Sequence, residues 1–203
     1  MNIEEYIRIK EFNYLEYCDY LQKKYGIGLA DYFTKSWNKN QKVTRTNDGL
    51  VAHHKFEDHA IMLSNKDYAQ KNPFEWQKKE NIVYCDYLEH LLLHILICEN
   101  PSDEKNLLEA VGVGGVINFI VPELNDVYSG FKTKQLWRKN LHDKIIDDKD
   151  VYMLLIKRFK NFCKRYGLEE IFAGEHLLSS FNEKFGLWER EKNTKIFEEI
   201  VRI

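Results

Sequence analysis

The stretch from Tyr87 to Cys98 constrains the fold more than any other part of the chain. Its apolar residues recur every three or four positions and cover most of one side, which predicts a helix that is largely buried. A buried helix needs other elements around it, so we expect this segment inside the core. His90 and His94 lie on one face of the helix, because residues four apart are stacked one turn above the other.

A pair of adjacent histidines, His53 and His54, ends a short apolar run that follows Asp48-Gly49. Asp-Gly before an apolar run is a turn-then-strand signal, and the β-rich residues at 81–85 predict a second short strand. The local order is therefore strand, loop, strand, helix. Adjacent side chains of a strand point to opposite faces, so one histidine of the pair can complete a metal shell with the two helix histidines. The other would stand beside the metal, free to take a proton from water.

At these positions the chain resembles the HNH endonucleases, which are also called ββα-metal or His-Me finger nucleases. It is similar to the versions encoded by phages and introns, which share a histidine pair, an asparagine before a short apolar strand, and a final Glu-His-x-x-x-His. Here that ending runs from Asn81 to His94, and the resemblance covers residues 48 to 98. It implies that His54 is the general base and that Asn81 braces the loop and orients His54. The implied metal ligands are His53, His90 and His94.

The resemblance implies a metal-dependent endonuclease that hydrolyses phosphodiester bonds of DNA, with RNA as a less expected substrate. The implied cofactor is one divalent ion, Mg²⁺, Mn²⁺, Zn²⁺ or Ni²⁺, and histidine ligands favour the transition metals among these. Double-strand cutting by an enzyme with one site per chain would suit a homodimer. Mobile-element homing, phage packaging and defence stay open as biological roles.

The sequence departs from the family pattern directly after the histidine pair. Lys55-Phe56-Glu57-Asp58 stands where many family members have Ile-x-Pro. Glu57, Asp58 and His59 can add a metal ligand or simply face water. The 4 cysteines are isolated singles, so no structural zinc site built from Cys-x-x-Cys pairs is expected.

Two interpretations from other functional classes stay open. The first is a catalytically inactive module that a metal stabilises and that binds nucleic acid or protein, which predicts metal-dependent melting without DNA cleavage. The second is a helical interaction protein whose histidines are coincidental. It predicts that replacing both His90 and His94 by alanine leaves the metal content and the melting temperature unchanged.

Composition places the chain among globular proteins and leads us to expect a cytoplasmic location. Of its 203 residues, 44% are apolar and 31% are charged. No apolar run approaches the roughly 18 residues that a membrane span needs, so no membrane partner is expected. Glu4 and Glu5 stand where a secretory signal would carry positive charge.

The formal net charge of −2 is not typical of a strong non-specific DNA binder, so local clusters of basic residues matter more. Three clusters stand out, at residues 35–45, 132–139 and 157–165. Each is either a phosphate-binding surface or an ordinary solvated face. The first lies just before the histidine pair and is best placed to touch a phosphate. We predict nucleic-acid contacts from Lys39, Lys42 and Arg45.

Together these patterns predict an α+β chain that is mainly helical. A small ββα-metal module of two short antiparallel strands and a helix, at 47–100, lies between N-terminal (1–46) and C-terminal (101–203) helical regions, or all three form one compact domain. Gly112-Val113-Gly114-Gly115 lacks the spacing of a phosphate loop and is expected to be a loop or a close approach of helices. Further predictions are helices at 3–25, 29–37, 57–63, 66–70, 151–166 and, split near Gly186, within 168–203, with a strand at 43–46.

Overall fold

The computed structural model describes residues 1–106, 109–173 and 190–203. Over these residues the chain is mainly helical with one small antiparallel sheet, which confirms that part of the predicted fold class. The elements, in chain order, are α1 (Ile3–Ile9), α2 (Tyr14–Tyr25), the 3₁₀ turns η1 (Gln41–Val43) and η2 (Thr46–Asp48), β1 (Val51–His54), α3 (Lys66–Ala69), the 3₁₀ turns η3 (Phe74–Gln77) and η4 (Lys79–Asn81), β2 (Ile82–Cys85), α4 (Tyr87–Glu99), α5 (Val113–Gly115), the π-helix η5 (Val116–Ile120), α6 (Val121–Tyr128), α7 (Leu136–Asp143), α8 (Lys149–Arg165), α9 (Glu170–Ala173) and α11 (Arg190–Arg202).

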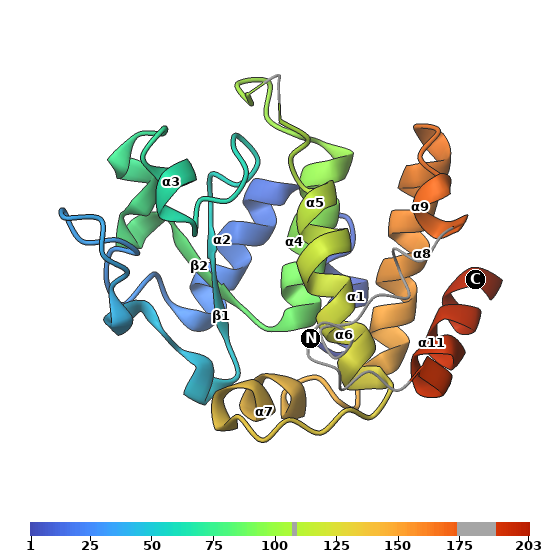
Figure 1. The fold of residues 1–203 in the computed structure, drawn as a ribbon. Helices are drawn as coiled ribbons and strands as arrows, with labels where there is room; N and C mark the ends of the chain where they lie inside the picture. Colours follow the sequence, from blue (N-terminus) through green and yellow to red (C-terminus); the bar gives the residue numbers. More distant parts are fainter. Residues whose placement is uncertain (107–108, 174–189) are drawn as a thin grey trace.

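Helix α4 lies at the centre of the molecule, as its apolar pattern predicts (Figure 1). The helix begins at a capping box, in which the Asp86 side chain accepts from the Glu89 amide and the Glu89 side chain accepts from the Asp86 amide. Leucines 91, 92 and 93 are all fully buried. Helices α2, α8 and η5 pack around α4, which fixes the face that carries its two histidines.

Strands β1 and β2 pair antiparallel, and both were predicted. His53 lies opposite Val83 and His54 lies opposite Ile82. Because successive strand residues alternate in direction, the two histidine rings lie on opposite faces of this sheet. Ile82 belongs to a small apolar cluster on the far side from α4, whereas Val83 belongs to the main core.

One hydrophobic core draws residues from all three predicted regions. It includes Met1 at one end of the chain, the α4 leucines, and Ile200 in α11. The small second cluster is built from Tyr32, Phe33, Val43, Ala69 and Ile82. None of the described helices combines the length and apolarity needed to cross a membrane.

Two predicted helices in the N-terminal half are wrong. The segment 3–25 is two helices, because Asn13 caps the start of α2 and forms a capping box with Glu16. The segment 29–37 is not helical. Its backbone bonds to distant partners instead: the Tyr32 amide donates to the Gln77 carbonyl, and the Asn40 amide donates to the Tyr32 carbonyl.

Two shorter predictions near the histidine pair are also wrong. The expected strand at 43–46 is replaced by the 3₁₀ turns η1 and η2. The expected helix at 57–63 is a series of turns. The helices predicted at 66–70 and 151–166 are confirmed as α3 and α8. The predicted division near Gly186 lies outside the described residues.

Candidate metal centre

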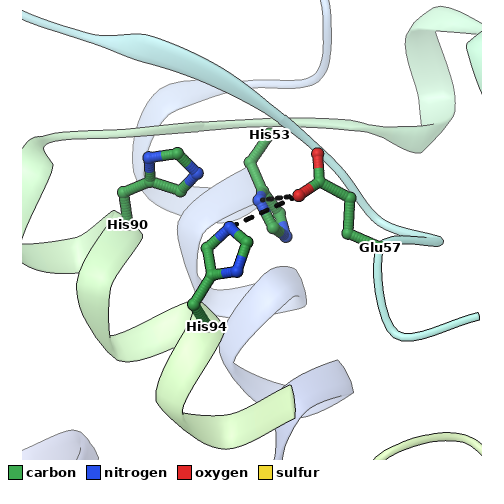
Figure 2. A group of neighbouring side chains, drawn as sticks. All are labelled: His53, Glu57, His90 and His94. Atoms are coloured by element: carbon green, nitrogen blue, oxygen red, sulfur yellow. Dashed lines mark ion pairs between the residues drawn. The ribbon is translucent and has the colours of Figure 1, made fainter. Parts of the chain in front are cut away.

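Four side chains gather between the end of β1 and the α4 helix. They are His53, Glu57, His90 and His94, and one potential ligand atom of each lies within 4.8 Å of all the others (Figure 2). The ring centroids of the three histidines are 4.9–5.3 Å apart. The structure therefore brings together the three histidines that were predicted as ligands and adds a carboxylate, so this group can hold a metal ion.

His53 is oriented by Tyr14, the first residue of α2. The Tyr14 hydroxyl lies 2.8 Å from His53 Nε2 and 3.1 Å from the Lys55 carbonyl oxygen, which can only accept. We infer that the hydroxyl donates to that carbonyl and accepts from Nε2–H of His53. This tautomer leaves a lone pair on His53 Nδ1, which is buried and has no hydrogen-bond partner among the described residues. A hydrogen bond on the far nitrogen is how a protein usually fixes a ligating imidazole.

His94 is oriented in the same way from the other side. Its Nδ1 lies 3.3 Å from the Gly112 carbonyl oxygen, so Nδ1 carries the proton and Nε2 keeps a lone pair. Gly115 lies directly over the ring, at a place where any Cβ atom would overlap the imidazole. The glycine-rich segment is thus a close approach to α4, which is one of the two forms predicted for it.

Glu57 points one carboxylate oxygen toward a nitrogen of each of these two imidazoles, His53 and His94 (Figure 2). Its Oε2 atom lies 3.5 Å from His53 Nδ1 and 3.3 Å from His94 Nε2. Both nitrogens carry lone pairs in the tautomers given above, so three acceptors face one another with no hydrogen between them. A cation resolves that conflict, as a shared proton also would. The donor set of three imidazoles and one carboxylate suits Zn²⁺, Ni²⁺ or Mn²⁺ better than Mg²⁺.

Two of the imidazoles are held in the neutral form that metal binding requires. Burial lowers the pKa of His53 to about 3, with the neighbouring His94 and His54 adding to the shift and Glu57 opposing it. Burial and the nearby His94 and His53 also hold the pKa of His90 well below its usual range. His53 and His90 therefore present lone pairs rather than protons at neutral pH.

His54, the predicted general base, lies behind Glu57 rather than in the open. The ring is fully buried against Tyr32, with centroids 4.4 Å apart. Its Nε2 lies 3.0 Å from Gln77 Oε1, and the Gln77 amide nitrogen points to the Leu63 carbonyl, so Nε2 of His54 is the donor. The remaining lone pair, on Nδ1, faces Glu57 Oε1 at 3.4 Å.

The other predicted site residues lie around the centre rather than in it. Asn81 donates from Nδ2 to the Glu75 carbonyl, and its backbone carbonyl accepts from the Lys55 amide. It therefore links the residue after β1 to the segment before β2. The ring of His54, however, is oriented by Gln77. Lys39 lies over the Tyr32 ring, on the His54 side of β1. The other two residues predicted to contact nucleic acid are Lys42 and Arg45. Lys42 is exposed, whereas Arg45 pairs with Asp48 and donates to the Tyr25 carbonyl.

A cavity of about 390 Å³ opens beside the four ligands. Glu57, His90 and His94 line it, and the α5–η5 segment supplies much of the opposite wall, including Gly115 and Phe119. His53 is fully buried behind these groups. The group of four side chains is therefore open to a cavity on one side and enclosed on the other.

The sequence indicates two further contributors to this group only loosely, and a third not at all. Glu57 is one of three residues expected either to add a metal ligand or to face water, and Gly115 belongs to a segment expected to be a loop or a close approach of helices. Tyr14 was not predicted. Tyr14 follows the Asn13 cap, a local signal for the start of α2, but nothing local says what its hydroxyl reaches. Comparisons of the chain with protein-family models, curated proteins and solved structures found no match.

Proposed function

We propose that this chain is a metal-dependent nuclease of the HNH type, which hydrolyses phosphodiester bonds in DNA. The observation that supports it best is the convergence of His53, His90, His94 and Glu57 beside a cavity, on a strand–strand–helix frame. Three of the four come from positions that match the family pattern. The carboxylate occupies the loop in which the sequence departs from that pattern.

The proposed chemistry divides between the metal and the chain. A divalent cation held by these four residues would neutralise charge on the phosphate and on the departing oxygen. Glu57 is the proton acceptor that lines the cavity. A water that attacks phosphorus would give its proton to this carboxylate while the bond from phosphorus to the departing oxygen breaks, and the proton can pass from Oε1 to the lone pair on His54 Nδ1, which faces it. His54 thus serves as the base from behind Glu57, and Gln77 fixes the tautomer that makes this possible.

A second candidate is a metal-stabilised binding module without catalysis. The burial of His54 favours it, because a fully enclosed imidazole has no direct contact with water in the cavity. In that case His54 serves only to orient Glu57 as a ligand. The metal centre is common to both candidates, and cleavage separates them.

The decisive experiment is nicking of supercoiled plasmid by the purified protein with Mg²⁺, Mn²⁺, Zn²⁺ or Ni²⁺, run beside a measurement of bound metal. We expect cleavage with at least one transition metal, and its loss together with the metal in the double variant His90→Ala, His94→Ala. His59→Ala changes a histidine outside the ligand group and is the matched control. It should keep both its bound metal and its cleavage activity.

The variant His54→Ala tests the base separately from the metal. We expect it to keep its bound metal, because His54 supplies no ligand, and to lose about 10²-fold or more in cleavage rate. Cleavage that persists in this variant would rule out His54 as the base. Metal binding without cleavage in the wild type would establish the inactive module, and absence of bound metal would rule out both candidates.

A further inference from the structure

A second and larger cavity joins the metal centre on the His90 side. Its volume is about 840 Å³, and it shares His90, Phe119 and Ile120 with the cavity described above. The rest of its lining comes from Tyr87 of α4 and from α6, α7 and the segment between them. We call it the α6–α7 groove, defined by Tyr87, Phe119, Lys132, Lys134 and Trp137.

The groove exposes two large aromatic rings to solvent. Trp137 is 47% exposed and Phe119 is 49% exposed. Trp137 lies in the first turns of α7, and Phe119 lies in the π-helix η5, next to the wall of the metal centre. Exposed rings of this size along a groove are stacking surfaces for planar groups.

The same groove carries cations that no acid neutralises. Lys132 and Lys134 are exposed, and no ion pair involves either of them over the described residues. The acidic side chain among the described lining residues is Glu123. Its carboxylate already accepts hydrogen bonds from Nε and Nη2 of Arg138, at 2.7 and 3.0 Å, and is bonded to His142. The local charge is therefore positive, although the chain as a whole is slightly acidic.

From these features we propose that the α6–α7 groove binds a single-stranded segment of nucleic acid and leads it to the metal centre. Lys132 and Lys134 contact phosphates, and Trp137 and Phe119 stack on bases. A single strand is specified because the bases of a duplex are already stacked on one another and cannot cover these rings. The proposal rests on the proposed nuclease function and names the substrate class of that site.

This assignment differs from the basic cluster favoured by the sequence. Arg45 is held by Asp48 and by the Tyr25 carbonyl, and its guanidinium lies over the Tyr84 ring. Lys39 lies over Tyr32, on the face of β1 opposite to His53. Neither residue lines the cavity beside the four ligands, whereas the α6–α7 groove includes His90.

The test measures binding by fluorescence anisotropy, so it does not depend on cleavage. The metal-loaded protein is titrated against a labelled 12-nucleotide strand with a cleavage-resistant phosphorothioate backbone, as DNA and as RNA, each alone and as a duplex. We expect tighter binding to a single strand than to its duplex, and the tighter of the two strands identifies the sugar. Trp137→Ala should raise the Kd about 5- to 150-fold, the effect of losing one stacked base.

The phosphate contacts of Lys132 and Lys134 are tested by the salt dependence of binding. The double variant Lys132→Ala, Lys134→Ala should bind more weakly and reduce the slope of log K against log salt by about 1.4, the value for two phosphates of a single strand. Matched controls are Lys139→Ala on the exposed face of α7 and Tyr166→Ala, whose ring is 58% exposed beyond α8. Both should bind like the wild type.

Three results would overturn the proposal that the groove binds a single strand. They are no binding of single strands, tighter binding of duplexes, and wild-type binding by the Trp137 and Lys132/Lys134 variants. Failure of the nuclease proposal looks different, because it appears as absence of cleavage with every metal, both of supercoiled plasmid and of the same single strand with an unmodified phosphodiester backbone, while these binding differences remain.

Discussion

Gly115 lies against the imidazole of His94, at a distance that leaves no room for a side chain. The contact joins the glycine-rich segment to a candidate metal ligand, so a residue larger than glycine does not fit at position 115 unless its surroundings move. The neighbouring Gly114 has open space, with Asn118 Nδ2 as the nearest heavy atom at 3.7 Å from a Cβ built there. Two glycines side by side in α5 thus have different roles.

Replacing Gly115 by alanine should weaken metal binding. The added methyl group overlaps the ring of His94, so either that ring or α5 must move, and the ligand geometry is lost. We expect a loss of about 10-fold or more in affinity for Zn²⁺, measured by competition with a chromogenic chelator. Gly114→Ala is the matched control and should bind metal like the wild type. Equal affinities for the two variants would contradict the contact.

Replacing Tyr14 by phenylalanine should also weaken metal binding, without removing a ligand. The hydroxyl holds His53 in the tautomer that frees Nδ1, and loss of such a hydrogen bond costs about 10- to 100-fold in affinity. Tyr17→Phe, a fully buried tyrosine one turn further along α2, is the control. If both variants bind metal like the wild type, His53 does not need Tyr14 for its orientation.

The free energy of unfolding of the metal-free protein should fall as the solution becomes acidic. His53 has a pKa of about 3 in the folded chain against 6.5 as an ordinary value, so the unfolded chain binds more protons between these limits. Stability from this group is complete above pH 6.5 and is lost as pH falls toward 3. Between pH 7 and pH 5 the expected loss is about 2 kcal/mol.

The measurement is urea unfolding in the presence of a chelator at pH 5, 6, 7 and 8. The variant His53→Gln should show a shallower decline over the same range, because it lacks the group that titrates. An identical decline in both proteins would mean that His53 is not held neutral.

Replacing Arg138 by methionine should destabilise the fold strongly. Arg138 is buried and bonds both Glu123 and Asp126, so the substitution leaves two carboxylates in the interior without their main cation. We expect a loss of about 3–5 kcal/mol in the free energy of unfolding. Lys139→Met is the control, since its side chain is 60% exposed, and should change stability by less than about 0.5 kcal/mol. A change below about 1 kcal/mol for Arg138→Met would show that water replaces the arginine.

The central helix α4 and the two strands β1 and β2 were predictable because their sequence signals are local. Helix α4 combines an apolar pattern with a capping box at Asp86 and Glu89, and β1 follows Gly49, which adopts a left-handed conformation with φ of 70°. The separate start of α2 was equally local. Asn13 and Glu16 form a capping box that the long apolar stripe of 3–25 concealed.

The segment 29–37 could not be predicted in the same way, because its conformation depends on distant partners. Trp37 has a positive φ of 60°, which no local preference of tryptophan favours. The segment is fixed by bonds such as those between the Leu29 amide and the Tyr84 hydroxyl.

The candidate site divides along the same line. The i, i+4 spacing predicted that His90 and His94 share one face of their helix. The strand pattern predicted that the side chains of His53 and His54 point to opposite faces of the sheet. The contributions of Glu57, Tyr14 and Gly115 depend on how a turn, the start of α2 and the short helix α5 come together in space. Their sequence separations from His94 exceed anything that a helical or strand period describes.

Three of the four candidate metal ligands stand on β1 and α4, two elements anchored in one continuous core, and Glu57 lies in the turn that follows β1. An ion that binds these four side chains in the folded chain also stabilises the fold. The gain in the free energy of unfolding grows with the ratio of the free ion concentration to Kd. A cell short of the ion would then hold a larger unfolded fraction, which proteases remove. The quantity of this protein in a cell would therefore follow the supply of the ion.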